Sequence, residues 1–288
     1  MQDIRRKLNV KKQRRFPSSL WIVFALAFLY LPLVIMAVFS FNDSKSLSSW
    51  SGFSLRWYQE LFVNQQMIDA IIVSVSIAIL STVVSTVLGT ITAIGISKSK
   101  LILRKIVLQV NNLPIMNPDI VTGISLMLLF SFVKVEKGYL TMLLAHIAFC
   151  TPFVITNVLP KVRQLDVNLA DAAMDLGATP FQALTKVIIP QIKPGIISGA
   201  LLAFTMSFDD FIISYFVSGN GIENISIVIY NMSKRTNPSI YALATIILVV
   251  VLLVVMLGTI IPKVFPKVTD RIMSSKVVKV VLAGCLLL

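Results

Sequence analysis

The sequence predicts an all-α integral membrane protein with six transmembrane helices. Hydrophobic residues make up 56% of the 288 positions, the mean hydropathy is +0.86, and only 14% of the residues are charged. A bilayer core about 30 Å thick requires roughly 20 consecutive apolar residues in a helix. Six stretches reach or approach that length, at about 20–40, 70–96, 106–133, 138–160, 195–217 and 240–262.

The distribution of positive charge predicts the orientation of these helices. If both termini face the cytoplasm, 20 of the 26 Lys and Arg residues lie in the inside segments. These segments are 1–19, 97–105, 161–194 and 263–288. Such asymmetry follows the positive-inside rule, so we expect an N-in, C-in topology. The net charge of +13 is then explained by contact with anionic membrane lipid, which leaves no reason to expect nucleic-acid binding.

The first 67 residues divide into a basic cytoplasmic tail (1–19) and a region containing the first span and an external loop (20–67). The apolar run 20–40 is too long for the core of a signal peptide and ends without a small-residue cleavage pattern, so it is predicted to remain as a helix. Within the loop, residues 54–62 form an amphipathic stretch with aromatic side chains. We expect this stretch to be a helix at the membrane interface.

The remainder is predicted to be a core domain of five transmembrane helices (68–264) followed by a cytoplasmic or apolar tail (265–288). The third span is interrupted at 111–119, which includes two prolines, three asparagines and Asp119. Backbone groups freed by such a break lack partners in lipid. We therefore expect the break to be buried against protein or to line a water-filled cavity, as broken helices in transporters do.

The inside segment 161–194 predicts a compact helix-turn-helix. Asp166 is suited to cap a helix over 167–176, which ends at Gly177 in the C′ position. Thr179 is suited to cap a second helix, with Pro180 at the first helical position and Gln182 completing a capping box. Pro190 and Pro194 are expected to end this helix before the fifth span. Apolar residues of the first helix leave one face that requires a partner.

This segment also carries a recognisable motif. Asp171-Ala172-Ala173-Met174-Asp175-Leu176-Gly177, nine further residues and Val187-Ile188-Ile189-Pro190 resemble the pattern E-A-A-x3-G-x9-I-x-L-P. This pattern marks the permeases of binding-protein-dependent ABC importers. The departures are Asp for Glu at 171, Val for Ile at 187 and Ile for Leu at 189, and the spacing is retained.

The resemblance implies a type I ABC importer permease fold in a bacterial inner membrane. It also implies that the loop is a coupling helix that docks into a separate ATPase subunit, through Asp171, Ala172, Ala173, Gly177 and Pro190. That subunit would bind ATP and Mg²⁺, since this chain has no G-x-x-x-x-G-K-[ST] sequence and no predicted cofactor. A second, similar permease and an external solute-binding protein would complete the system.

Over residues 1–272 the chain resembles the spermidine/putrescine permeases of the PotC type. The resemblance is carried by segments 53–58, 118–126 and 203–214. It implies polyamine import, with a polyamine-binding protein as the external partner. Import of another small solute through the same architecture is the alternative, because related permeases share the coupling loop.

Acidic and aromatic residues near the spans are candidates for the solute pathway. Carboxylates at bilayer depth face a cavity, a partner or a cation, and aromatic faces attract ammonium groups. The candidate pathway residues are Asp209, Asp210, Asp119, Phe208 and Tyr215. Asp209 and Asp210 are adjacent on the predicted helix and therefore point about 100° apart, so one is expected to face the path and the other to pair with a neighbouring subunit. Asp119 has a second interpretation, as the cap of the helix after Pro118.

Two other readings of the same acids are open. An ion-coupled secondary transporter would use Asp209 or Asp210 as its ion site. An intramembrane aspartyl protease would need Asp119 and Asp210 side by side, and the expected G-x-G-D context is absent. We predict no catalytic residue and no metal site, because His146 is the single histidine and, like Cys150, is expected to pack in the interior.

The segment Leu282-Ala283-Gly284-Cys285 resembles a lipobox. It suggests either a remnant of a fusion to a lipoprotein binding partner or a plain hydrophobic tail.

Overall fold

A computed structural model describes residues 18–44, 49–219, 221–234 and 238–264. Most of the predicted basic tail and all of the tail 265–288, including the lipobox-like segment, lie outside the described residues. The chain forms two compact units, one made of residues 1–61 with 238–247 and the other of residues 62–237 with 248–288. In the described part of the chain, every regular element longer than a single bridge is a helix.

The first unit contains α1 (Ser18–Phe39) and most of the predicted interfacial helix, which is α2 (Arg56–Val63). The loop between them is held by hydrogen bonds. Asn42 pairs with Phe53 in an isolated antiparallel bridge, and the indole Nε1 of the buried Trp57 donates to the Asn42 carbonyl at 2.6 Å. The tryptophan thus fixes α2 to the loop rather than lying free at an interface.

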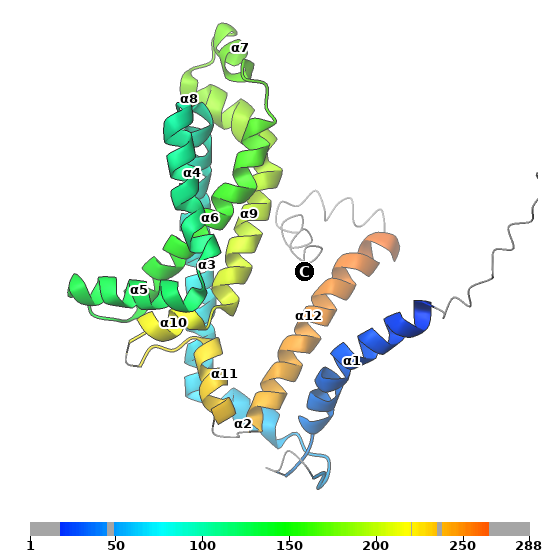
Figure 1. The fold of residues 1–288 in the computed structure, drawn as a ribbon. Coiled ribbons are helices and arrows are strands. Elements are labelled where there is room, and N and C mark those ends of the chain that lie inside the picture. Colours follow the sequence, from blue (N-terminus) through cyan, green and yellow to red (C-terminus); the bar gives the residue numbers. More distant parts are fainter. Residues whose placement is uncertain (1–17, 45–48, 220, 235–237, 265–288) are drawn as a thin grey trace, which may run out of the picture. The chain divides into compact units, whose positions relative to one another are not determined.

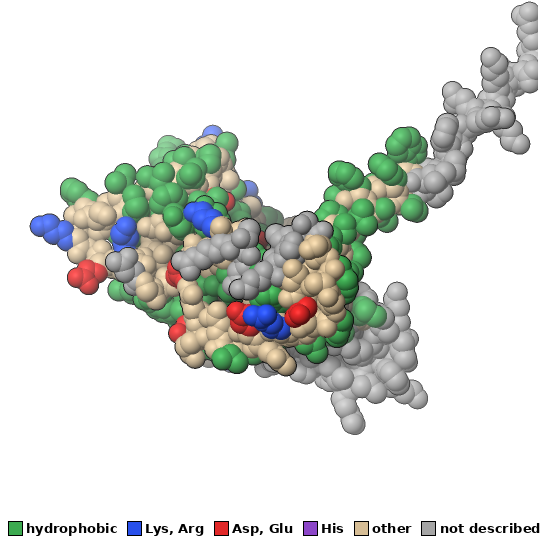
Figure 2. All heavy atoms as spheres, turned by 90° about the horizontal axis from the view of Figure 1, so that it is seen from below, with side chains coloured by type: hydrophobic (Ala, Val, Ile, Leu, Met, Phe, Trp, Pro, Cys, Tyr) green, Lys and Arg blue, Asp and Glu red, His purple; other side chains and the backbone are tan. Residues whose placement is uncertain are grey.

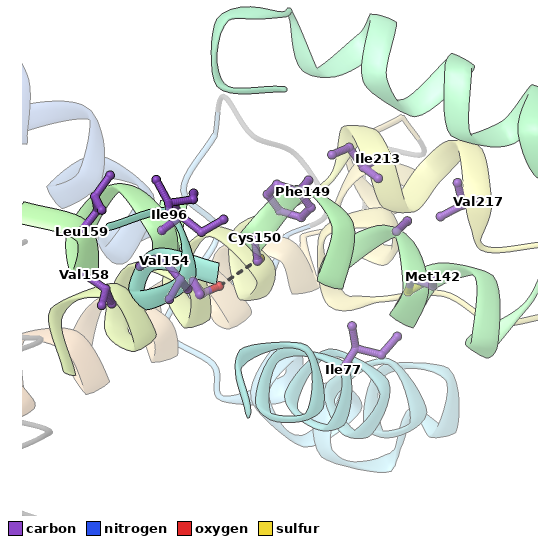
Figure 3. Close-up of a cluster of buried hydrophobic side chains, with 14 of the residues drawn as sticks. Ile77, Ile96, Met142, Phe149, Cys150, Val154, Val158, Leu159, Ile213 and Val217 are labelled. Atoms are coloured by element: carbon purple, nitrogen blue, oxygen red, sulfur yellow. Dashed lines mark hydrogen bonds between the residues drawn. The ribbon is translucent and has the colours of Figure 1, made fainter. Parts of the chain in front are cut away.

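Three long helices form the core of the second unit: α3 (Gln65–Lys98), α6 (Tyr139–Arg163) and α9 (Ile189–Asp209) (Figure 1). Apolar side chains between them are almost completely buried, as Figure 3 shows for Ile77, Met142 and Val154, among others. The thiol of Cys150 donates to the Ala203 carbonyl at 3.4 Å, which ties α6 to α9. Cys150 is therefore a packing residue, as predicted.

Two glycines bring α3 and α9 close to the same residue of α6. A Cβ atom at Gly89 of α3 would lie 2.7 Å from the Cβ of Val154, and one at Gly199 of α9 would lie 3.2 Å from the Cα of the same valine. Val154 on α6 is thus held between the other two helices. Small residues at such contacts let helix backbones pack tightly in a membrane. Gly95, in contrast, faces open space.

The predicted break in the third span is present, but the two halves do not continue in one direction. α4 (Leu101–Met116) and α5 (Asp119–Phe132) meet at 107°. α4 ends at Met116 because Pro118 disfavours a helical conformation for Asn117, the residue before it, which is extended. Pro114, in contrast, is accommodated inside α4. The interruption predicted within 106–133 is thus present, and the bent pair is either one broken span or a re-entrant loop.

The fifth span also differs from the prediction. The apolar run 195–217 is divided, because α9 ends at Asp209 and a separate short helix, α10, covers Ile212–Val217. At the N-terminal end of α9, the prolines at 190 and 194 do not end the second hairpin helix. That helix passes through the π-helical segment η1 (Ala183–Ile188) directly into α9, since the wider π turn accommodates the missing proline N–H.

Four helices are long and apolar enough to cross a membrane, or five if α4 and α5 together count as one span, within the residues that the structure describes. The four are Trp21–Phe39, Gln65–Lys98, Tyr139–Arg163 and Pro180–Asp209. The sixth predicted span, 240–262, coincides with α12 (Ser239–Val264), of which Ser239–Val250 meets the criteria for a shorter apolar helix.

Within the second unit, two groups of short helices lie at opposite ends of the α3–α6–α9 bundle (Figure 1). The hairpin that contains α7 (Leu169–Asp175) and α8 (Pro180–Gln182) stands at one end. The other end carries α10 and α11 (Ile225–Lys234). A signal between these ends would have to pass along the bundle.

Candidate coupling hairpin and translocation site

The first helix of the hairpin is shorter than predicted. α7 begins at Leu169, two residues later than expected, with Asn168 in the N-cap position and no side-chain cap. Asp166 instead accepts a hydrogen bond from the Asn168 backbone N–H at 2.9 Å, which makes a local turn before the helix. The predicted capping residue therefore shapes the entry to the helix without occupying its cap.

Gly177 ends α7 in the way the sequence predicts. Its φ of +88° is in the left-handed region, where glycine is favoured. The Gly177 N–H donates to the Met174 carbonyl at 2.9 Å, and the Ala178 N–H donates to the Ala173 carbonyl at 3.1 Å. These two bonds make a complete Schellman motif, so the helix ends at a defined residue.

The second helix starts with a capping box, also as predicted. The Gln182 N–H donates to Thr179 Oγ1 at 3.3 Å, and the Thr179 N–H donates to Gln182 Oε1 at 3.0 Å. Pro180 occupies the first helical position. Because η1 continues this helix into α9, the hairpin is joined to a transmembrane helix without an intervening loop.

The hairpin exposes large apolar side chains. Val167 and Leu176 are each 90% exposed and Phe181 is 73% exposed, and α7 has no buried residue. Asp171 and Ala172 are also exposed, while Ala173 is half-buried. A soluble surface seldom carries such a group of apolar side chains without a partner. Pro190 is exposed on the other side of η1.

At the opposite end of the bundle, Asp210 holds the break between α9 and α10. Its carboxylate accepts hydrogen bonds from the backbone N–H groups of Ile213 (3.2 Å) and Ser214 (2.7 Å) and from Ser214 Oγ (2.7 Å). The backbone at Asp210 is extended. Asp210 therefore caps the first turn of α10 with its carboxylate, through bonds within its own chain.

The centre of this polar group is His146, to which the sequence analysis assigned only packing. It is 1% exposed, and its Nδ1 and Nε2 are hydrogen-bonded to Ser207 Oγ (2.7 Å) and Ser214 Oγ (2.9 Å). Nε2 also lies 3.5 Å from Asp210 Oδ2. Ser207 continues the network to Ser81 on α3 at 2.9 Å. The sequence contained one sign of this role. A lone histidine and several serines lie in apolar runs at bilayer depth, and such polar side chains are buried only with hydrogen-bond partners.

Asn224 joins α11 to the same network. Its Nδ2 donates to the Asp210 carbonyl at 2.7 Å and to Ser214 Oγ at 2.9 Å. Its Oδ1 accepts from the Ile227 backbone N–H at 2.9 Å, which caps α11. The adjacent Ile225 N–H donates to Ser74 Oγ on α3 at 2.7 Å. Both short helices are therefore fixed to the bundle by buried hydrogen bonds.

Asp209 and Asp210 have different environments. Asp209 is the last residue of α9 and is exposed, and it forms no ion pair with any described residue. Phe208 is half-buried and stacks on Phe204, with ring centroids 5.9 Å apart. The argument that both acids project from one continuous helix was wrong, because the helix ends between them.

Three aromatic rings meet next to this break. Phe211 lies 4.6 Å from Tyr230 and 5.6 Å from Tyr215, measured between ring centroids, and the two tyrosines are 6.1 Å apart. The Lys234 Nζ is 4.3 Å from the centroid of the Tyr230 ring. Hydrogen bonding to the Tyr230 side chain raises the pKa of the Lys234 ammonium above its ordinary value. From below (Figure 2), charged side chains form small separate groups among hydrophobic and polar ones.

Asp119 is placed apart from these acids. It is the first residue of α5 and is exposed, with Pro118 in the cap position and no side-chain cap bond. It therefore does not cap the helix with its side chain, although a carboxylate in a first turn interacts favourably with the helix dipole. α5 itself packs closely on α10, because a Cβ atom at Gly123 would lie 2.9 Å from the Phe216 ring.

No hydrogen bond joins Asp119 to Asp210 in the described residues, so the paired carboxylates of an aspartyl protease are not formed. The same residues contain no group of three His, Cys, Asp or Glu side chains suited to a metal ion.

Comparison with known proteins identifies the architecture. Residues 85–265 match the family model described as the binding-protein-dependent transport system inner membrane component. The chain is 37% identical over 225 residues to the spermidine/putrescine transport system permease protein PotC of Escherichia coli K12, covering 78% of this chain and 85% of that protein. It is 38% identical over 235 residues to the putrescine transport system permease protein PotI of the same organism, covering 79% and 84%.

Solved structures support the same fold. A bacterial ABC transporter that imports the acidic polysaccharide alginate has a chain that superposes with a TM-score of 0.64 at 18% identity. The match covers 81% of this chain and 88% of that chain. The family excludes the secondary-transporter and protease alternatives, and it gives the subunit no catalytic or cofactor-binding role. The chain belongs to the binding-protein-dependent transport system inner membrane component family and is a permease subunit of an ABC importer.

Proposed function

We propose that this chain imports polyamines of the spermidine and putrescine class, with six membrane spans and both termini in the cytoplasm. The observation that carries the coupling part of the proposal is the hairpin. Its two helices are fixed by a Schellman motif and a capping box, it exposes Leu176 and Phe181, and it continues into α9 without a loop.

A hairpin with these properties is suited to transmit force. An ATPase subunit that covers its apolar side chains would gain about 25 cal/mol for each Å² of apolar surface buried. Movement of the hairpin would then pass through η1 to α9, at whose far end Asp209 lies. We assign docking contacts to Asp171, Ala172 and Ala173, a conformational role to Gly177, and the junction with α9 to Pro190.

The polyamine part of the proposal rests on the relatives and on the chemistry at the α10 end. Asp209 is an exposed carboxylate without an ion pair among the described residues, and Tyr215 and Phe208 present aromatic surfaces nearby in sequence. Ammonium groups are attracted to both kinds of side chain. Asp119 is a further contact for a cation, and Asp210 contributes by holding the break.

The assembly we propose contains a second, similar permease, an ATPase subunit and an external polyamine-binding protein. The predicted tail 1–19 anchors the orientation at anionic lipid. The domain divisions at 1–19, 20–67, 68–264 and 265–288 follow from this topology.

The test is uptake of radiolabelled spermidine and putrescine by proteoliposomes that contain the full assembly. We expect uptake that needs ATP, the binding protein and an intact ATPase subunit. A matched control uses an ATPase subunit with its Walker-A lysine replaced, which should retain binding to the permease but abolish uptake. Uptake of another solute class, with no polyamine uptake, would reject the substrate while leaving the importer architecture in place.

A further inference from the structure

One side chain bridges the break between α9 and α10. His146 projects from α6, and its two ring nitrogens are hydrogen-bonded on opposite sides of the break. Nδ1 lies 2.7 Å from Ser207 Oγ in the last turn of α9, and Nε2 lies 2.9 Å from Ser214 Oγ in α10. Because an imidazole is a rigid planar ring, the two helices cannot move apart without breaking one of these bonds.

The His146 ring is itself held in place. It is buried and packs edge-on against Phe149 of the same helix, with ring centroids 5.5 Å apart. Its partner Ser207 is hydrogen-bonded in turn to Ser81 of α3 at 2.9 Å. Close packing leaves a buried ring little room to rotate, so the imidazole holds the two helix ends at a fixed spacing.

The hydrogen-bond partners assign a proton to Nε2 of this ring. Ser214 Oγ also contacts Asp210 Oδ2 at 2.7 Å and Asn224 Nδ2 at 2.9 Å. The carboxylate accepts and the amide donates, so the single hydroxyl proton of Ser214 goes to Asp210. The remaining lone pair of Ser214 Oγ accepts from Nε2–H. In the neutral ring Nδ1 is then the acceptor for the Ser207 hydroxyl, and each nitrogen makes its own directed bond.

The break would otherwise behave as a hinge. Between the two helices the backbone is extended at Asp210 and continues through Phe211 before α10 begins. A few non-helical residues of this kind can absorb a movement of the helix on one side. α9 continues into the coupling hairpin through η1, whereas α10 is bonded to Asn224 at the start of α11. A movement that starts at the hairpin therefore reaches α10 only if the hinge is held.

We propose that His146 is a positioning residue for transport, which clamps α9 to α10 across the hinge so that movement of the coupling hairpin reaches the α10 end of the bundle. This inference deepens the proposed function and rests on it for the role of the hairpin and for the cargo. His146 acts through α10 and not by touching solute. Both ring nitrogens are needed, because a side chain bonded to one helix alone cannot hold the two together.

Two substitutions each keep one half of the clamp. An asparagine places its amide near the position of Nδ1 and can still bond to Ser207, whereas a glutamine reaches the position of Nε2 and can still bond to Ser214. His146→Asn and His146→Gln should therefore melt at higher temperatures than His146→Leu, yet be as poorly coupled. A purely structural role would place both variants between wild type and His146→Leu in melting and in coupling alike.

The experiment measures the ATP hydrolysed for each spermidine imported, in proteoliposomes that contain the full assembly and its binding protein. All three variants should raise this ratio by about two- to tenfold, the factor by which one buried hydrogen bond changes an equilibrium between two arrangements.

Matched controls remove a bond from α6 to only one side of the break. Cys150→Ala loses the thiol bond to the Ala203 carbonyl of α9, and Thr141→Val loses the hydroxyl bond to the Val217 carbonyl of α10. Neither bond crosses the hinge, so both controls should keep the wild-type ratio of ATP to spermidine.

A second measurement needs no cargo. Spin labels at Lys193→Cys on α9 and Tyr215→Cys on α10 report the distance between the two helices with and without ATP. The background carries Cys150→Ala and Cys285→Ala, which removes both native cysteines. The distance distribution should stay narrow in both states when residue 146 is histidine, and it should broaden when that residue is asparagine or glutamine.

An unchanged ATP ratio in His146→Asn and His146→Gln, or an equal rise in the one-sided controls, would overturn the clamp. The two measurements also separate the clamp from the cargo. If the substitutions broaden the distances but the wild type imports no spermidine, the clamp stands and the proposed cargo fails. If wild-type import is normal and neither substitution changes the distances, the proposed function stands and the clamp fails.

Discussion

Replacement of Gly177 by alanine tests the coupling hairpin through one backbone conformation. Gly177 has a φ of +88°, and a Cβ atom added there meets no atom within 4 Å. Steric contact therefore contributes nothing, and the cost is that of placing an L-residue in the left-handed region. This cost is about 1–2 kcal/mol. This cost destabilises the end of α7, where the Gly177 and Ala178 N–H groups donate to carbonyls of the last turn of the helix.

A penalty of this size reduces the ratio of the docking conformation to its alternatives by a factor of about 5 to 30. If the ATPase subunit binds only the docking conformation, its affinity for the permease falls by up to the same factor. The assay is a titration of the ATPase subunit onto permease complexes immobilised in nanodiscs, followed by uptake at limiting ATPase concentration. The Gly177→Asn variant should lie between wild type and Gly177→Ala, since asparagine tolerates this conformation better than alanine.

Gly95→Ala is the matched control. An added Cβ at Gly95 also meets no atom within 4 Å, but this glycine lies inside α3 and has no positive φ. Alanine is favoured over glycine in a helix interior, so ATPase affinity should be unchanged. The reasoning is refuted if Gly177→Ala binds the ATPase subunit as tightly as wild type, or if Gly95→Ala weakens binding equally.

Four further changes probe the bundle and the α9–α10 break. Asp210→Asn should destabilise the protein by about 1–3 kcal/mol, because a charged acceptor for the Ile213 and Ser214 N–H groups is lost. Asp209→Asn should leave thermal unfolding unchanged and reduce polyamine uptake. Melting and uptake are measured in parallel for both variants. If Asp209→Asn lowers the melting temperature and Asp210→Asn reduces uptake without lowering it, the assigned roles are wrong. His146→Leu should lower the melting temperature by leaving the Ser207 and Ser214 hydroxyls without their ring partner, at a cost of about 1–3 kcal/mol; an unchanged melting temperature would show that these hydroxyls find other partners. Gly89→Ala should cost about 1–3 kcal/mol through overpacking against Val154. Adding Val154→Ala should recover part of that loss, and a double variant that is merely the sum of the two single ones would argue against direct contact.

The amino-acid sequence by itself determined the membrane class, the number of apolar runs and the local chemistry of the hairpin. These features depend on composition and on short-range rules. An apolar run long enough to span a bilayer, glycine at a left-handed position and the Thr179–Gln182 capping box are all properties of neighbouring residues. The family motif was readable for the same reason, because it keeps a fixed spacing around Gly177 and Pro190.

The tertiary structure decided where the helices break and which polar side chains meet. The hydropathy of the run 195–217 gives no sign that α9 ends at Asp209. The break depends on the Asp210 carboxylate, which accepts a hydrogen bond from the Ser214 N–H of α10 and lies close to His146 of α6. His146 lies 61 and 68 residues from its two serine partners. The passage of the helix through Pro190 depends likewise on the π-helical turn before it. Such contacts form only when distant helices pack together, since a buried polar group takes whichever partner the fold brings within reach.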